Sequence, residues 1–309
     1  MRILLCLLSL LLLGPAWGQR PDVVRQVRAA LGAGDLAGAE RLAAGYRSTS
    51  GIDRPYLEAL SWIGRGKLAA KQYGAADQVS AEVRKLALAE MERKPLDAES
   101  SLPLALGASI EVHAEVLDQQ GQKAEAIAFL REELARWRST SMRARIQKNL
   151  NLLNLEGHSA LALDVSEYLG QQPRPLPRYR GQPILLFFWA HWCPECKEEG
   201  PVIARLMQEF GPQGLVVLAP TQRYGYTGRG EDASRTEETA YIGQVWAKFY
   251  PTLSAVPIPV NEENFRVYGA STTPTLVLID RAGIVRLYHP GTMSYEELQP
   301  RVRAVTAGH

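Results

Sequence analysis

The chain has 309 residues, and its 35 Lys and Arg nearly balance 33 Asp and Glu, which leaves a net charge of +2. The arginines are dispersed and no groove-like pattern of basic and aromatic residues appears, so the sequence argues against nucleic-acid binding. The length predicts two domains, and the composition is ordinary for a globular protein.

The first 18 residues have the pattern of an export signal. Arg2 precedes an apolar run from Ile3 to Leu13, and small residues follow up to Gly18. This order predicts a signal peptide, residues 1–18, and an exported, periplasmic protein. The apolar run is short for a membrane span, and an uncleaved membrane anchor is the alternative. Cys6 lies inside the run without a preceding small residue, which argues against a lipoprotein.

Residues 19–170 are rich in Ala, Leu, Glu and Arg and predict an all-α domain. A short turn followed by a helix face of small residues recurs irregularly along it. We expect a helical repeat-like, tetratricopeptide-like domain, with an irregular helical bundle as the alternative. The four turns with their following small residues are Ala33–Ala39, Lys71–Ala76, Gln120–Ala126 and Leu155–Leu161.

A proline-rich segment, residues 171–180, divides the chain. Pro173, Pro175 and Pro177 cannot continue a helix, and they favour an extended, semi-stiff linker. Strands and helices alternate beyond it, so residues 181–309 predict an α/β domain. The predicted strands are Ile184–Trp189, Leu215–Ala219, Leu276–Ile279 and Ile284–His289, with an extended edge segment at Val256–Val260; the predicted helices are Lys197–Phe210, Glu237–Phe249 and Tyr295–Val305.

Two features lie in an insertion between Pro220 and Pro251. The polar, aromatic and glycine-rich loop 221–230 follows the carboxyl end of a predicted parallel strand, where open α/β sheets place their sites. We expect this loop to border a substrate groove, with a plain surface loop as the alternative. The predicted helix after it should bury one face, formed by Ile242, Val245, Trp246 and Phe249.

The chemistry of the chain centres on Cys193 and Cys196. The strand before them and the helix after them place Cys193 at a helix start, where free N–H groups and the helix dipole stabilise a thiolate. Pro194 suits the first helical position. Cys196, one turn on, can attack a mixed disulfide. Half of a zinc site is the alternative, but no second pair of ligands completes it, so we expect no metal.

Cysteine usage supports a working dithiol. Removal of Cys6 with the signal leaves only Cys193 and Cys196, so this pair can close only on itself or on a partner. An exported protein could form structural disulfides, yet this chain has no further cysteines for them.

The stretch from Phe188 to Cys196, which includes Trp192, Pro194 and Glu195, resembles the active site of the thioredoxin superfamily, and the TlpA/ResA-like exported thiol-disulfide oxidoreductases in particular. The resemblance extends from about Pro173 to the C-terminus. It implies that Pro201 kinks the active-site helix, that Glu199 is an active-site acid, and that Thr273 and Pro274 form a cis-proline loop beside Cys193.

Other positions depart from the family. Phe187 stands where many thioredoxins have a buried carboxylate, which leaves Glu195 and Glu199 as the nearby acids. Glu195 should raise the pKa of the thiols, whereas His191 would lower the thiol pKa if it were protonated. For both Glu195 and Glu199, the alternative is an ordinary first-turn acid of the helix. Ala190 stands where peroxiredoxins have a threonine, which argues against a peroxidase.

The resemblance implies a periplasmic thiol-disulfide oxidoreductase that reduces disulfides of exported partner proteins without a cofactor. Its partners would be protein thiols and disulfides and a redox donor protein, and the helical domain is a candidate for binding a protein partner. A disulfide oxidase or isomerase remains an alternative. A helical-repeat adaptor with a docking thioredoxin domain is the other, although docking alone would need neither Cys193 nor Cys196.

Overall fold

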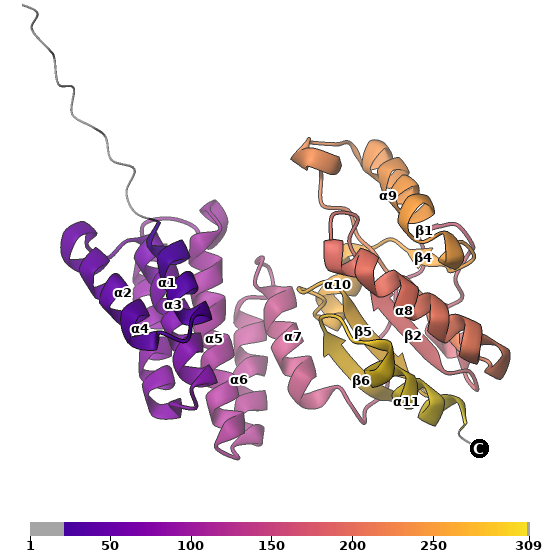
Figure 1. Ribbon diagram of the computed structural model, residues 1–309, viewed down its shortest axis with the longest axis horizontal. Coiled ribbons are helices and arrows are strands. Elements are labelled where there is room, and N and C mark those ends of the chain that lie inside the picture. The colour runs from indigo at the N-terminus through magenta and orange to yellow at the C-terminus, as the bar shows by residue number, and fades with distance from the viewer. Residues whose placement is uncertain (1–21, 308–309) are drawn as a thin grey trace, which may run out of the picture.

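The computed structural model describes residues 22–307, so the predicted signal peptide and Cys6 lie outside the described residues. Helices alone fill the first part of that range, and a mixed α/β arrangement follows, as Figure 1 shows. This order confirms the predicted fold class. In the described part of the chain, no helix combines the length and apolar character needed to span a bilayer.

Seven helices form the N-terminal half. Asp22, Asp35 and Asp53 cap three of them, because each side chain accepts a hydrogen bond from a backbone N–H of the first turn. The helices are α1 (Val23–Gly32), α2 (Leu36–Ser50), α3 (Arg54–Ala69), α4 (Tyr73–Met91), α5 (Ser101–Gln119), α6 (Lys123–Arg136) and α7 (Arg143–Asn154), with a 3₁₀ turn at Leu96–Ala98.

Three of the four predicted turns join neighbouring helices. Gly34, Lys71 and Gly121 adopt positive φ angles of 77°, 58° and 80° between α1 and α2, α3 and α4, and α5 and α6. Each pair packs side by side, and small buried residues such as Ala59 and Ala87 permit the close approach. The tetratricopeptide-like character of these pairs stays a prediction.

The helix expected after the fourth predicted turn was wrong. Gly157 does adopt a positive φ of 84°, but no helix follows it. Instead, the Gly157 and Ala160 N–H groups donate to the carbonyls of Val285 and Gly283, and Ser159 bridges Ile284. The segment therefore lies along the outer strand of the C-terminal sheet, whose free edge groups satisfy its backbone.

The predicted linker at residues 171–180 differs from the packing. Leu155, Leu163 and Tyr179 are buried in the core of the C-terminal half, and Arg174 N–H donates to the Tyr179 hydroxyl over 3.0 Å. A 3₁₀ turn, Leu176–Tyr179, follows the prolines. The structure therefore favours a boundary near Asn154, and the proline-rich segment covers the sheet rather than linking two separate bodies.

The C-terminal half is built on a four-stranded mixed sheet of order β3-β2-β5-β6. β2 pairs parallel with β3 and antiparallel with β5, which pairs antiparallel with β6. The strands are β2 (Ile184–Phe188), β3 (Val216–Leu218), β5 (Thr275–Ile279) and β6 (Val285–Pro290), while β1 (Tyr168–Leu169) and β4 (Ile258–Pro259) form a separate antiparallel pair; the helices are α8 (Pro194–Phe210), α9 (Arg235–Phe249), α10 (Glu262–Tyr268) and α11 (Tyr295–Thr306).

The central strand β2 is buried on both faces, as its uninterrupted apolar run predicts. Its alternate residues enter two cores: Leu185 and Phe187 pack with α8, α9 and α11, while Leu186 and Phe188 pack with α10 and the segment after Asn154. Two layers of helix and loop thus enclose the sheet, and the carboxyl end of β2 leads directly into the cysteines.

One prediction for the inserted helix α9 was wrong. Ile242, Val245 and Trp246 are buried as expected, but Phe249 is 40% exposed and lies beneath the ammonium of Lys197, 4.5 Å from the ring centroid. The helix ends at Phe249, and the chain turns at Tyr250, which is fully buried in the place we expected for Phe249.

The two halves are joined by close packing of α7 against α10, which Figure 1 shows as neighbours at the centre of the molecule. Arg143 donates two hydrogen bonds to the Glu263 carboxylate, of 3.0 and 2.5 Å. Asn151 donates to the Tyr268 carbonyl over 2.9 Å. At Gly269 a Cβ atom would lie 2.3 Å from the backbone nitrogen of Lys148, so only glycine permits this approach.

Candidate active site

The cysteine pair lies where a strand ends and a helix begins. Cys193 is the N-cap residue of α8, and its sulfur accepts a hydrogen bond from the Cys196 N–H over 3.1 Å. Pro194 takes the first helical position, where no N–H is needed. The two cysteines form a disulfide with their Cα atoms 5.3 Å apart. A thiolate at Cys193 would keep this N–H donor and the positive end of the helix.

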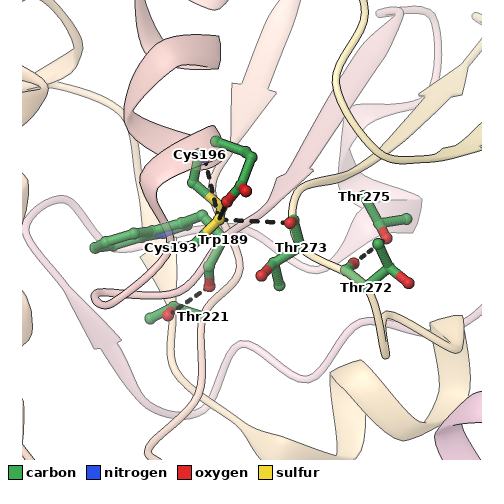
Figure 2. Close-up of a disulfide and its surroundings, with 8 residues drawn as sticks. Trp189, Cys193, Cys196, Thr221, Thr272, Thr273 and Thr275 are labelled. Atoms are coloured by element: carbon green, nitrogen blue, oxygen red, sulfur yellow. Dashed lines mark hydrogen bonds between the residues drawn. A yellow bond between two sulfur atoms is a disulfide. The ribbon is translucent and has the colours of Figure 1, made fainter. Parts of the chain in front are cut away.

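Figure 2 shows the cis-proline loop facing the disulfide. The Thr273–Pro274 bond is cis, as the resemblance implied. The Thr273 carbonyl oxygen lies 3.4 Å from the Cys193 sulfur, and Thr275 anchors the loop by donating to the Thr272 carbonyl over 2.6 Å. The backbone of Thr273 therefore lies directly beside the Cys193 sulfur.

Both cysteines are fully buried in this disulfide state, whereas the residues around them reach the surface. Trp192 is 45% exposed, and Pro194 and Glu195 are exposed as well. The Glu195 carboxylate lies 3.7 Å from the Cys193 sulfur, close enough for its charge to oppose a thiolate there. These three exposed residues form the rim around Cys193.

Glu199 is a buried acid one helical turn after Cys196. It is only 2% exposed, and one carboxylate oxygen accepts a 3.2 Å hydrogen bond from the Met293 N–H. The other oxygen, Oε1, has no partner among the described residues. Burial raises the pKa of Glu199 to about 7, although the Met293 N–H opposes the shift. Near neutral pH, the Glu199 carboxyl can therefore both accept and release a proton.

Phe187 and Pro201 take the places that the sequence indicated. Phe187 is fully buried and meets the edge of Tyr250, with ring centroids 6.1 Å apart, so an apolar ring fills the space of a carboxylate. Pro201 lies inside α8. Glu199 is therefore the acid buried in the helix that carries Cys196, while Glu195 stays at the surface.

No pattern in the sequence indicates a second buried acid near the site, Glu238 of α9. One Glu238 oxygen lies 3.2 Å from His191 Nε2 and also accepts the Tyr224 N–H over 2.5 Å, and the other accepts the Gly225 N–H over 2.8 Å. His191 and Glu238 are 47 residues apart, and no local pattern links them. The one local signal is the capping box of Ser234 and Glu237, which marks the start of α9 but does not indicate the pairing of Glu238 with His191.

Three tyrosines enclose His191, since the rings of Tyr224, Tyr226 and Tyr241 each meet it edge-on at 5.4 to 5.6 Å. Burial lowers the pKa of His191, against the opposing effect of Glu238. The imidazole is therefore neutral near neutral pH and does not supply the positive charge that would lower the thiol pKa. Tyr224 in turn contacts Trp192, with ring centroids 5.4 Å apart, which ties loop 221–230 to the rim.

Comparison with known proteins agrees with this geometry. A sequence model of the AhpC/TSA family matches residues 157–223, which include both cysteines. The thiol-disulfide oxidoreductase ResA of Geobacillus thermodenitrificans is 27% identical over 149 residues, 48% of this chain and 77% of that protein. The thiol:disulfide interchange protein DsbE of Xylella fastidiosa is 28% identical over 127 residues, 41% of this chain and 56% of that protein.

Among solved structures, the exposed lipoprotein thioredoxin of Streptococcus pneumoniae is 25% identical, with a TM-score of 0.34; the match covers 42% of this chain and 90% of that one. The sheet, the disulfide at the start of α8 and the related sequences define the class. The C-terminal half is a thioredoxin-like domain, and the protein is a thiol-disulfide oxidoreductase similar to ResA and DsbE.

Proposed function

We propose that this protein is a periplasmic reductase that passes two electrons from the Cys193–Cys196 dithiol to disulfides of exported partner proteins. The observation that supports it most is the placement of Cys193: its sulfur meets a helix N–H on one side and the Thr273 carbonyl on the other. The first contact favours a thiolate, and the second brings a partner's backbone beside it.

The reaction begins from the reduced dithiol. The Cys193 thiolate attacks one sulfur of the partner's disulfide, so a mixed disulfide forms and one partner thiolate leaves. Cys196 then loses its proton and attacks the Cys193 sulfur. The internal disulfide forms and the second partner thiolate leaves, so the partner gains two electrons and the enzyme becomes oxidised. A dithiol donor protein must then reduce the enzyme for another turnover.

Glu199 is the base that we assign to the second step. It lies on the same helix, one turn beyond Cys196, and both side chains are buried. Its pKa of about 7 lets it accept a proton near neutral pH, and its Oε1 atom has no other donor among the described residues. Glu195 reaches the Cys193 sulfur from the surface and serves to tune that thiol.

The match to the AhpC/TSA family does not favour a peroxidase. Ala190 occupies the position of the peroxidase threonine, is fully buried and has no hydroxyl to hold a peroxide. A disulfide oxidase is the alternative, and it would run the same thiol-disulfide exchange in the opposite direction. A measured redox equilibrium with glutathione decides between them, because a reductase must have the lower potential.

Trapping tests the assignment of the two cysteines. A Cys196→Ser variant cannot resolve the mixed disulfide, so it should accumulate covalent adducts with partner proteins in a periplasmic extract. Cys193→Ser should accumulate none, and a Cys193→Ser/Cys196→Ser double variant controls for non-specific binding. The N-terminal sequence of the recovered protein tests export, since cleavage after Gly18 leaves Gln19 first.

Equal sets of adducts on the two single variants would overturn the assigned order of attack. An intact Met1 on protein recovered from the membrane fraction would support the uncleaved anchor instead. The adducts would also identify the partner proteins by mass spectrometry.

A further inference from the structure

A polar cleft lies between the helical half and the active-site edge of the sheet. It encloses about 700 Å³, and its walls come from both halves of the molecule. The turn between α6 and α7, together with the first two residues of α7, forms one wall. Gln222, part of α10 and Ala270–Ser271 form the other.

Two segments that line the cleft continue toward the cysteine pair. Ser271 begins the loop whose Thr273 carbonyl lies 3.4 Å from the Cys193 sulfur. Gln222 follows Thr221, which donates to the Trp189 carbonyl over 2.9 Å at the end of β2, as Figure 2 shows. Two residues of extended chain span about 7 Å, so a partner bound at Cys193 and passing Thr273 reaches the cleft within three to five residues of its cysteine.

The walls of the cleft are held in place. Arg143 at the start of α7 donates twice to Glu263, and Gly269 fits directly against the backbone at Lys148. On the helical side, Ser141 donates to Asp97 over 2.5 Å, which fixes the turn. A preformed cleft spares a bound chain the cost of ordering its receptor.

The lining of the cleft is rich in hydrogen-bonding groups. Hydroxyls, an amide and guanidinium groups suit a polar, extended polypeptide better than an apolar one. These side chains are Arg138, Ser139, Thr140, Gln222, Arg266 and Ser271.

One positive charge in the lining is uncommitted. Arg143 is paired with Glu263, and Arg266 is paired with Glu262 and Glu263. Arg138 is exposed and has no ion pair within the described residues, 22–307. A carboxylate on the bound segment would complement it.

We propose that this cleft binds an extended, polar segment of the disulfide-bearing partner, with an acidic residue facing Arg138. The α6–α7 turn is then a substrate-recognition element, and the helical half selects protein disulfides over small ones. The inference rests on the proposed reductase function and assigns a task to the helical half, which has no cysteine within its described residues.

Two matched peptides and one small disulfide test it. Each peptide carries one cysteine in a disulfide with 2-nitro-5-thiobenzoate, so one turnover of reduced enzyme releases the peptide thiol and one coloured thiolate. One peptide has Asp or Glu three to five residues from the cysteine on both sides, and the other has Asn or Gln there. The small disulfide is 5,5′-dithiobis(2-nitrobenzoate).

Arg138→Glu should slow the acidic peptide about fivefold or more and leave the amide peptide and the small disulfide nearly unchanged. Arg131→Glu, an equal charge change on an exposed residue of α6 outside the cleft, is the control. Ser139→Trp should slow both peptides, because the ring fills the cleft, and should leave the small disulfide unchanged. That last rate also shows that the variants are folded.

Wild-type rates for both peptides in Arg138→Glu and Ser139→Trp would overturn the cleft while leaving the reductase intact. If the reduced wild-type protein reacts with none of the three probes, the proposed reductase function and the proposed cleft are both overturned. Equal slowing of acidic and amide peptides by Arg138→Glu would overturn the acidic preference.

Discussion

The two halves of the molecule differ in how many hydrogen-bond partners they provide for a buried glutamate. In the helical half, Glu133 is 4% exposed and both of its oxygens are used: Arg84 donates to one over 2.5 Å and the Trp137 indole to the other over 2.9 Å. In the α/β half, Glu199 is equally buried but has only the Met293 N–H, and its Oε1 atom has no partner in the described chain.

The same difference extends beyond these two acids. Among residues 22–307, seven buried side-chain polar atoms have no partner, and only one, on Arg54, belongs to the helical half. Those on His191, Glu199 and Thr273 belong to the site described above. An unpaired buried polar atom costs about 1 to 3 kcal/mol, so stability alone does not explain why the α/β half retains these atoms. The helical half is built for stability, and the active-site region keeps groups free for chemistry.

The largest expected effect on stability comes from Glu199→Gln. An acid whose pKa rises from 4.5 to about 7 on folding holds its proton more tightly in the folded state. The free energy of unfolding therefore falls as pH rises from about 4.5 to 7, by roughly 3 kcal/mol, and is constant above. Gln cannot ionise and still accepts from Met293. The variant should match the wild type at pH 4 and exceed it by roughly 3 kcal/mol at pH 8.

Urea unfolding of the oxidised protein between pH 4 and 8 measures this difference. Glu198→Gln, at an exposed neighbouring position, should keep the wild-type dependence. In the reduced protein, Glu199→Gln should slow resolution of a mixed disulfide by roughly 10² near pH 7, because Cys196 loses its base. A pH dependence and resolution rate equal to those of the wild type would make Glu199 a structural acid like Glu133.

The next effect is smaller and falls on the other half. Glu133→Ala leaves the buried Trp137 indole N–H without an acceptor, whereas Arg84 is partly exposed and can bind water. The free energy of unfolding should fall by about 2 kcal/mol. Reduction rates for small disulfides should equal those of the wild type at a temperature where both are folded. A changed redox rate in the folded variant would contradict the division between the halves.

The α/β half could be read largely from the sequence, because its signals are local. The apolar run of β2, the spacing of Cys193 and Cys196 and the turn at Gly283 each determine their own surroundings. The family resemblance implied that Glu199 is an active-site acid but did not predict its burial, which the structure shows together with its bond to the Met293 N–H.

The errors arose where a distant partner decides the structure. Gly157 has the same turn signal as Gly34, but the free edge of β6 captures the chain after it. Phe249 has helical spacing, yet the chain leaves the helix one residue later and buries Tyr250 instead. The pair of His191 and Glu238 depends on an insertion folding back over the site, which no local pattern encodes.

The smallest expected effect tests whether every buried acid near the site resembles Glu199. Glu238 lies in the α/β half but is bonded like Glu133, since its two oxygens meet the Tyr224 and Gly225 N–H groups and His191. In Glu238→Gln the new amide NH₂ must face one of these N–H donors, which should cost about 1 kcal/mol.

Because both Glu238 oxygens have partners, Glu238→Gln should be slightly less stable than the wild type, whereas Glu199→Gln should be more stable at pH 8. Reduction of 5,5′-dithiobis(2-nitrobenzoate) should also proceed at the wild-type rate, because Glu238 touches loop 221–230 and His191 rather than the sulfurs. Urea unfolding at pH 5 and pH 8 measures the first property, with the exposed Glu231→Gln as the control. A variant more stable than the wild type would place Glu238 with Glu199, and the unpaired oxygen would then no longer distinguish a chemical acid from a structural one.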